Sequence, residues 1–498
     1  MSVQEELLDP GAPVATGASA TPGRLTGRLG PIAIVFMVVA AAAPLTILVS
    51  APTNMLNGNG AGMAAIYFIA PMLLMLFAPG FAAMTRYVPK AGAFYSYVTA
   101  GFGRDVGVGA GFVAIAGYLV FQSFVYTLMA MTITDTLAGF FGDDAPRLPW
   151  FVWVFVMIAI VGVLGVSNID VNAKVLSVVL IVEVLTIIVM NVAVIVRGGT
   201  PSEGVSLFAG LTPDVLFSAP LAISLLIGFS VGLGFEATAI FRDEARDPER
   251  TIPRAIYITL GSAAVFYSFA VWGFVQGWGT HGVMRALRAD PALQFSIVYE
   301  TGARYVGPVF SQIMQVVALT SMFACVLAYH NIAARYLHSM GHSVLPQRLT
   351  AVHPKSGAPF IASVATSAVG VVAILLWMLS GLEPATFIGW EVAVGTLAIL
   401  MVFVLTSAAI FVYFRRNPAK RGNAWVSTVS PVLAFVVLGS IMLTAMFNFG
   451  SLSGAVDSPA LNIVLELVPV AMFAAGVVAA KIAKRRSPER YAGLVHHE

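Results

Sequence analysis

Long apolar stretches follow one another along almost the whole chain, and they constrain its fold more than any single motif does. Each holds about 20 residues or more, the length that crosses the hydrocarbon core of a bilayer as a helix. Only 10% of the 498 residues are charged and 58% are hydrophobic, whereas soluble domains carry about 25% charged residues. The sequence therefore predicts an all-α integral membrane protein. The expected spans are 31–56, 61–83, 105–134, 149–167, 173–196, 216–241, 253–275, 305–334, 358–380, 387–414, 427–448 and 459–482.

Basic residues are distributed unequally between the connections of these twelve spans. If both ends of the chain are cytoplasmic, 22 of the 27 Lys and Arg residues fall in cytoplasmic segments. Cytoplasmic loops of membrane proteins carry this excess, and an error in the number of spans would invert every later loop. We therefore expect a multi-pass protein of the plasma (inner) membrane with both termini inside. The net charge of +3 reflects this bias and indicates no nucleic-acid partner.

The two ends of the chain are polar. Residues 1–29 are rich in Ala, Gly, Ser, Thr and Pro and contain no apolar core, so we expect a disordered cytoplasmic tail and not a signal peptide. A second cytoplasmic tail is expected at 483–498. The single cysteine, Cys325, lies in an apolar stretch, so an intramolecular disulfide is excluded.

Two of the predicted spans contain residues that interrupt a helix at membrane depth. The first span carries Pro44 after a run of small residues, and the sixth carries Gly228, Gly232 and Gly234. Backbone groups freed by such breaks are tolerated in a membrane only where they line a cavity or are buried in protein. Interrupted segments in corresponding halves point to the substrate site of a transporter built from inverted repeats. The alternative is a common proline kink and glycine packing contacts.

Three sequence motifs resemble those of one family. The sixth-span exit reads Gly-Phe-Glu-Ala-Thr-Ala over 234–239 and Asp-Pro-Glu-Arg-Thr-Ile-Pro-Arg-Ala-Ile over 247–256. The first internal loop reads Pro-Lys-Ala-Gly-Ala-Phe-Tyr over 89–95, and the eighth-span exit contains Ala-Arg-Tyr at 334–336. By these motifs the chain resembles the amino acid–polyamine–organocation permeases, over about residues 27–480.

The resemblance implies a leucine-transporter-like fold of twelve transmembrane helices. Helices 1–10 would form a 5+5 inverted repeat with broken helices 1 and 6. This transport core would cover 30–414, with repeats at about 30–197 and 214–414. Accessory helices 11 and 12 would cover 425–482.

The two breaks are the expected substrate site. Half-helix N-termini attract a carboxylate, and freed carbonyls attract an ammonium group. The Ala-Ala-Pro sequence at the first break departs from the Gly-Ser-Gly-like run common in the family, which leaves an amine or polyamine substrate open. The candidate substrate-binding residues are Ala42, Ala43, Pro44, Leu45, Thr46, Phe229, Ser230, Leu233, Gly234 and Glu236.

Three titratable residues are candidates for binding a coupling proton or cation. Glu183 lies in the apolar fifth span, where many related permeases carry a lysine; the alternative is a neutral, hydrogen-bonded glutamic acid. Glu236 follows the sixth-span break and could instead cap the half-helix or act in gating. His330 in the eighth span titrates near neutral pH when unperturbed, although packing is the favoured reading.

Charged residues beside the sixth span are expected to form an internal gate with the 84–104 loop. The alternative is a solvated face that only sets topology. The candidate gate residues are Arg86, Arg242, Asp243, Glu244, Asp247 and Arg250.

The sequence favours secondary active transport over other functions. It lacks metalloprotease and phosphate-binding motifs and any cysteine–histidine metal cluster, so neither an enzyme nor a metal or organic cofactor is expected. We expect a permease that carries an amino acid or small organic amine by alternating access with H⁺ as coupling ion. The alternatives are Na⁺ symport, amino acid/polyamine exchange, and a non-transporting nutrient sensor on the same fold.

Overall fold

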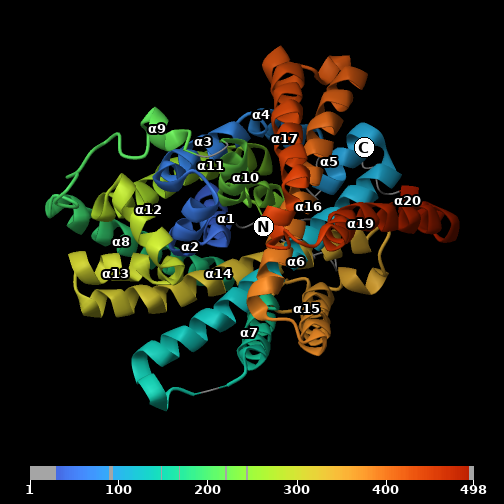
Figure 1. Ribbon diagram of the computed structural model, residues 1–498. Helices are drawn as coiled ribbons and strands as arrows, with labels where there is room; N and C mark the ends of the chain where they lie inside the picture. Colours follow the sequence, from blue (N-terminus) through green and yellow to red (C-terminus); the bar gives the residue numbers. More distant parts are fainter. Residues whose placement is uncertain are drawn as a thin grey trace, which may run out of the picture.

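Helices joined by short segments make up the part of the chain that the structure describes (Figure 1). The computed structural model describes residues 30–88, 94–146, 148–167, 169–218, 221–242 and 245–492. Within these ranges a single isolated β-bridge joins Thr200 and Gly204. A helix pairs its own backbone groups, so it is the form that long apolar runs adopt where water is absent. The all-α fold class is confirmed.

The helices of the first six expected spans and their connections precede residue 240. They are α1 (Pro31–Ala42), α2 (Pro44–Asn57), α3 (Met63–Leu74), α4 (Ala78–Tyr87), α5 (Phe94–Phe102), α6 (Arg104–Phe141), α7 (Trp150–Gly165), α8 (Ile169–Val196), α9 (Pro213–Leu216), α10 (Leu221–Val231) and the 3-10 helix η3 (Phe235–Ala239).

The remaining helices run from the seventh expected span to the C-terminal segment. They are α11 (Pro248–Trp278), α12 (Thr280–Ala289), α13 (Ile297–Tyr305), α14 (Pro308–Gly341), α15 (Phe360–Ser380), α16 (Pro384–Arg416), α17 (Ser430–Phe447), α18 (Phe449–Ser453), α19 (Pro459–Arg486) and α20 (Pro488–Ala492).

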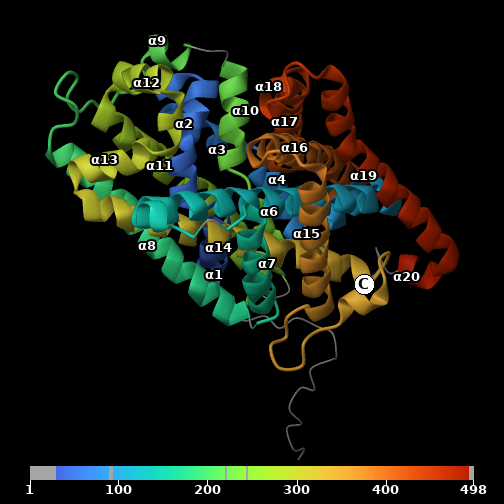
Figure 2. The same ribbon diagram turned by 60° about the horizontal axis from the view of Figure 1, so that its bottom comes forward.

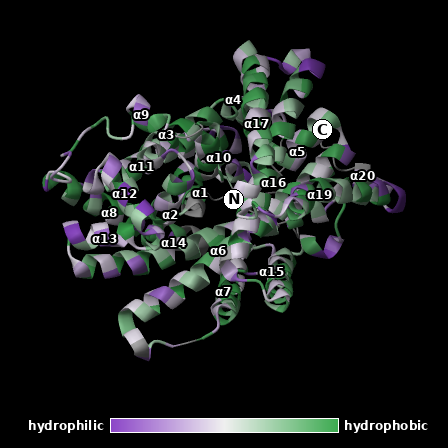
Figure 3. Cartoon of the chain, in the orientation of Figure 1, coloured by the Kyte–Doolittle hydropathy of each residue, from purple (hydrophilic) through white to green (hydrophobic). Residues whose placement is uncertain are grey.

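Nine helical stretches within the described residues are long and apolar enough to cross a membrane. The three expected spans outside this set are the two broken ones and α7, which has only 16 residues. Hydrophobic residues cover the long helices, and hydrophilic residues gather mainly near helix ends and connections (Figure 3). The nine stretches are Gly60–Tyr87, Arg104–Phe141, Leu176–Val196, Pro248–Trp278, Pro308–Gly341, Phe360–Ser380, Thr386–Arg416, Trp425–Phe447 and Pro459–Arg486.

The first expected span is two helices that meet at Ala43. Ala43 adopts φ 50° and ψ 78°, and it is the single non-glycine residue with positive φ among those described. Pro44 opens α2 because its missing N–H is not needed at the first position of a helix. The left-handed conformation costs a residue with a Cβ roughly 1–2 kcal/mol, so the surrounding structure must hold this break in place.

The sixth expected span also breaks, between α10 and η3. Gly234 has φ 106°, a conformation that glycine adopts because it has no Cβ. Gly228 and Gly232 have a different role, since a Cβ on either would lie within 2.5 Å of Ile66 or Leu74 on α3. They allow close packing of α10 on α3.

The two breaks are neighbours in space. A Cβ on Gly234 would lie 3.9 Å from the carbonyl oxygen of Val38 on α1, and η3 packs against both α1 and α11. Around them, α6 crosses the molecule and packs against α14, α16 and α19 (Figure 2). This arrangement puts the two breaks beside helices whose buried faces carry polar side chains.

Candidate site at the two helix breaks

Glu183 on α8 reaches the start of α2. Its Oε2 accepts hydrogen bonds from the backbone amide of Leu45 at 3.2 Å and from the hydroxyl of Ser321 at 2.6 Å. The side chain is fully buried, and Oε1 has no hydrogen-bond partner among the described residues. Oε1 is therefore the carboxylate oxygen of Glu183 that the surrounding described residues leave without a donor.

The free amides at the start of α2 are occupied by the chain's own side chains. The Thr46 amide and hydroxyl both donate to the Ser321 oxygen, at 3.4 and 3.1 Å. Pro44 has no N–H, and the next amide, that of Ile47, donates to the carbonyl of Ala43. A ligand carboxylate would have to displace Glu183 or Ser321 to reach these donors.

Glu236 holds the second break. One carboxylate oxygen accepts the amide of Gly234 at 2.9 Å, and the other accepts the hydroxyl of Tyr118 from α6 at 2.6 Å. Glu236 lies in the first turn of η3 and reaches back to the amide of Gly234, the residue before that helix, as the carboxylate of a capping box does. The side chain is buried, so Glu236 also places a titratable group beside α6.

The other sixth-span candidates contribute backbone and apolar surface. The Phe229 carbonyl accepts the Gly232 amide at 3.1 Å, and the Phe229 ring packs edge-on against Phe403. Leu233 is buried in the same core. Ala42 ends α1, and Ser230 lies one residue before the end of α10; the structure describes neither side chain.

His330 lies in a polar cluster of its own. Its Nδ1 is 3.3 Å from the Gln122 amide nitrogen on α6, and its Nε2 is 2.7 Å from the Ser363 hydroxyl on α15. Among the described residues, no hydrogen bond joins these groups to Glu183 or Glu236, and both imidazole nitrogens have polar partners. His330 is thus packed between α6 and α15, apart from the two breaks.

Among the described gate candidates, one arginine makes a hydrogen bond to a distant helix, and two other residues form an ion pair within one turn. Arg242 is buried and donates to the carbonyl of Thr85 on α4 at 2.7 Å. Arg250 and Asp247 are 3.9 Å apart within one turn, and both side chains are mainly exposed. Arg86 is exposed as well, and Asp243 and Glu244 lie outside the described residues.

Several polar residues of the site carried no sequence signal. Ser321 is one of three serines in α14, and only its position opposite Glu183 reveals its role. Tyr118 is one of several aromatic residues along α6, and only its position in the fold shows that its hydroxyl donates to Glu236. Glu391 on α16 is different, because a carboxyl group in an apolar span is visible in the sequence; it is buried, and no hydrogen bond among the described residues joins it to either break.

These features define a multi-pass membrane protein with a polar site buried at two helix breaks. Its described residues contain no group of His, Cys, Asp and Glu side chains that could hold a metal ion. The chain belongs to the amino acid permease family, whose model matches residues 33–490. The family is one of transporters, not enzymes.

Three relatives show the range of proteins that the chain resembles. It is 24% identical over 379 residues to the branched-chain amino acid permease BcaP of Lactococcus lactis subsp. cremoris, covering 72% of this chain and 76% of the relative. It is 25% identical to the low-affinity putrescine importer PlaP of Escherichia coli, over 62% and 66%. It is 24% identical to the aromatic amino acid transport protein AroP of Escherichia coli, over 85% and 88%.

Proposed function

We propose that the protein is a secondary active transporter that carries an amino acid or a related small organic amine across the plasma membrane. The observation that carries the proposal is the pair of neighbouring helix breaks held by the buried carboxylates Glu183 and Glu236. Broken helices at membrane depth are where such transporters bind their substrates. The relatives, which include amino acid permeases and a putrescine importer, support the same substrate class.

The charge of the interior favours a substrate with an ammonium group. Glu183, Glu236 and Glu391 are all buried, and the described residues give none of them a salt-bridge partner. Carboxyl groups inside a membrane face a cavity, pair with another group or take part in proton relays. A substrate ammonium or a proton would neutralise them.

Glu183 is our candidate for proton coupling, with Glu236 as a second titratable group. In this proposal a proton bound at Oε1 of Glu183 weakens the hydrogen bond that Oε2 accepts from the Leu45 amide. The start of α2, at the first break, is then held less firmly. Protonation would thereby be coupled to the position of α2. Na⁺ symport and exchange remain the alternative forms of coupling.

The architecture that we propose has twelve spans, with α1 plus α2 as the first and α10 plus η3 as the sixth. Residues 30–414 would form the transport core, with inverted repeats at about 30–197 and 214–414. Residues 425–482 would add two accessory helices, and the tails 1–29 and 483–498 would be cytoplasmic. The side-specific labelling of single cysteines in each connection, in a Cys325→Ala background, tests this topology.

Substrate and coupling are tested by reconstitution. The purified protein in liposomes should take up one or more labelled amino acids or polyamines, and an inward proton gradient should accelerate uptake. Acceleration by a sodium gradient alone would identify the alternative coupling ion. The absence of uptake and counterflow with every amine would favour a nutrient sensor and reject transport.

Glu183→Gln separates coupling from binding. We expect this variant to keep counterflow, which needs no net proton movement, and to lose stimulation by a proton gradient. Glu466→Gln on α19 is the matched control because it also changes a carboxyl group in an apolar helix, away from the breaks. If Glu183→Gln stays as dependent on pH as the unchanged protein, Glu183 is not the coupling site.

A further inference from the structure

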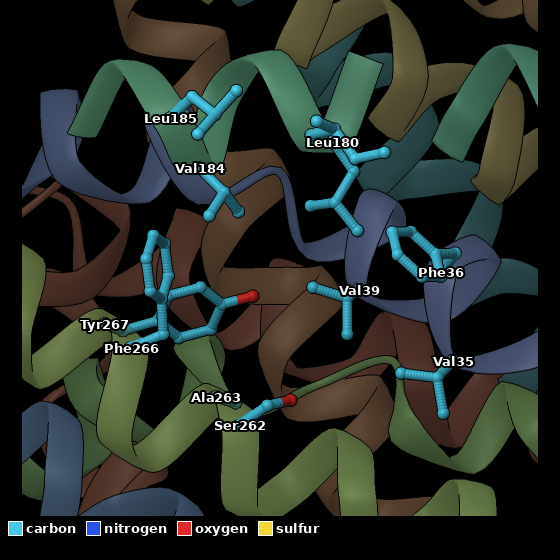
Figure 4. A pocket seen from close by; sticks show the side chains of 11 residues that line it. Val35, Phe36, Val39, Leu180, Val184, Leu185, Ser262, Ala263, Phe266 and Tyr267 are labelled. Atoms are coloured by element: carbon cyan, nitrogen blue, oxygen red, sulfur yellow. The ribbon is translucent and has the colours of Figure 1, made fainter. Parts of the chain in front are cut away.

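An apolar pocket lies behind the first break, between α1, α8 and α11. Its volume is about 340 Å³. Figure 4 shows Val39 of α1, Leu180 and Val184 of α8 and Ala263 of α11 around the same space. The three helices thus enclose a space that their described side chains leave unfilled.

The pocket is continuous with the apolar outer surface of α8. Two of its lining residues, Ile181 and Leu185, are 48% and 54% exposed. Val178 and Val192, which do not line the pocket, continue the same exposed apolar surface along the helix. In a multi-pass membrane protein such a surface contacts lipid chains, so the molecules that reach the pocket come from the bilayer.

The lining offers little to a polar ligand. Ser262 donates its hydroxyl to the Thr259 carbonyl on its own helix at 3.0 Å. The Tyr267 hydroxyl is directed into the pocket (Figure 4) and has no hydrogen-bond partner among the described residues. Every other lining side chain is a hydrocarbon. The lining therefore matches a hydrocarbon chain, and an ion or a zwitterion would lose its hydration without compensation.

We propose that this pocket binds an acyl chain of a membrane lipid. The chain would enter past Ile181 and Leu185 and end against Val39 and Ala263. It would restore the dispersion contacts that an empty cavity forfeits. None of the lining residues is among the candidate substrate-binding residues, and the proposal does not depend on transport.

The position of the pocket connects the bound chain to the first break. Leu180 and Val184 lie on the α8 face next to the one that carries Glu183, and α1 ends at Ala42, one residue before the break at Ala43. A bound chain would therefore pack between the half-helix α1 and α8, the helix whose Glu183 accepts the Leu45 amide. The lipid would stabilise the break from the membrane side.

Photolabelling tests the site in the full chain. The protein is reconstituted in liposomes that contain a phospholipid with a diazirine at the middle of one acyl chain, and labelled residues are mapped by mass spectrometry. We expect adducts at the recessed residues Val39 and Ala263 as well as at the exposed side chains. Adducts confined to exposed residues such as Val178 would overturn the proposal, and this measurement needs no variant.

Three substitutions define the occupant. Val184→Phe fills the pocket and should abolish labelling at Val39 and Ala263, whereas Val192→Phe on the same helix should not change it. Persistence of both adducts in Val184→Phe would contradict the site. Tyr267→Phe should leave labelling unchanged, because an acyl chain has no group for the hydroxyl. Loss of labelling in Tyr267→Phe would instead show that the hydroxyl holds a polar group of the probe in the pocket, and would reject the acyl chain as the occupant.

Discussion

At the first break an alanine takes the left-handed conformation that a glycine takes at the second. Both residues interrupt a helix by adopting a positive φ, but the energetic cost of that conformation differs between them. Gly234 adopts positive φ without strain, whereas Ala43 is held there between α1 and Pro44. The residue before a proline is also kept out of the right-handed helical region, so Pro44 helps to exclude the straight-helix alternative.

The strain argument predicts the effect of Gly234→Ala. A Cβ at φ 106° costs about 1–3 kcal/mol, so we expect a lower thermal unfolding temperature in detergent and reduced substrate uptake. Gly439→Ala on α17 is the control, because a Cβ there meets no atom within 4 Å, and alanine favours a helix. A Gly234→Ala protein as stable as the control would show that the break tolerates a side chain.

The hydrogen bond between Tyr118 and Glu236 gives a second prediction at this scale. Tyr118→Phe keeps the buried ring and leaves one Glu236 oxygen without its donor, at a cost of about 1–3 kcal/mol. Tyr126→Phe on the same helix should cost less, because its hydroxyl accepts only a 3.3 Å bond from Gln122. Thermal unfolding of the two variants measures the difference. Equal losses would mean that the Glu236 bond adds no stability.

Single residues also show what the sequence could and could not predict about the site. Glu183 and Glu236 were identifiable because a carboxyl group in an apolar span is rare and costly. Ser321 was not, since a serine in a membrane helix usually bonds its own backbone and its partner is 138 residues away. Long-range pairs of this kind depend on packing, which no local pattern specifies.

Among the elements, α12 begins in an unusual way. Its first amides are capped by Glu203, 77 residues earlier, whose Oε2 accepts the amide and hydroxyl of Thr280, both at 2.7 Å. Partial burial alone would raise the pKa of Glu203, but the hydrogen bonds from Thr280 outweigh it and hold the pKa below the ordinary value of 4.5. The connection after α8 is thereby joined to the start of α12.

This lowered pKa predicts a pH-dependent helix start. Because the folded pKa lies below the unfolded one, the stabilisation is complete above about pH 4.5 and is lost as the pH falls through the folded pKa. The protection of the amides at residues 279–289, measured relative to their intrinsic exchange rates at each pH, should therefore fall on acidification. Glu203→Gln should exchange faster at neutral pH, and the difference from the unchanged protein should shrink in acid.

Glu300→Gln is the control for this experiment. Its carboxylate accepts the Ser296 hydroxyl on α13 and does not touch α12. Exchange at α12 that responds equally to both substitutions would contradict the capping role of Glu203.

The elements that the sequence predicted best are those marked by residues that interrupt a helix or by long apolar runs. The breaks at Ala43 and Gly234 fall where proline and glycine placed them. The helices α12 and α13, between the seventh and eighth expected spans, were missed because they are short and mixed in polarity. Such segments become helical through packing, which stabilises them more than intrinsic propensity does.

Across the whole molecule, the C-terminal segment joins helices that are distant in sequence. Arg490 of α20 donates to the carbonyls of Gly341 and Leu345 at the end of α14. Tyr491 donates to Asp105 at the start of α6, and Arg104 lies over the Tyr491 ring at 5.3 Å. α20 therefore connects α6, α14 and α19 at one end of the molecule.

Arg490→Ala should release this connection. The carbonyls of Gly341 and Leu345 lose their hydrogen bonds to a charged donor. Each such bond contributes about 1.5–3 kcal/mol when it is buried, and less where water can replace the donor. We expect faster hydrogen exchange at 487–492 and at 341–345. Arg485→Ala, which changes an exposed basic residue in the last turn of α19, should leave both segments unchanged. Protection at 341–345 that survives Arg490→Ala would show that α20 merely rests on the surface.

The contact between Glu183 and the Leu45 amide has a pharmacological consequence. The chain supplies its own carboxylate to the donors at the start of α2, so this half of the site contains an internal competitor at fixed, high local concentration. A carboxylate-bearing inhibitor gains only the difference between its contacts and those it displaces. Compounds that offer a cation to the free oxygen of Glu183, and no acid, are therefore the better starting point for a selective blocker.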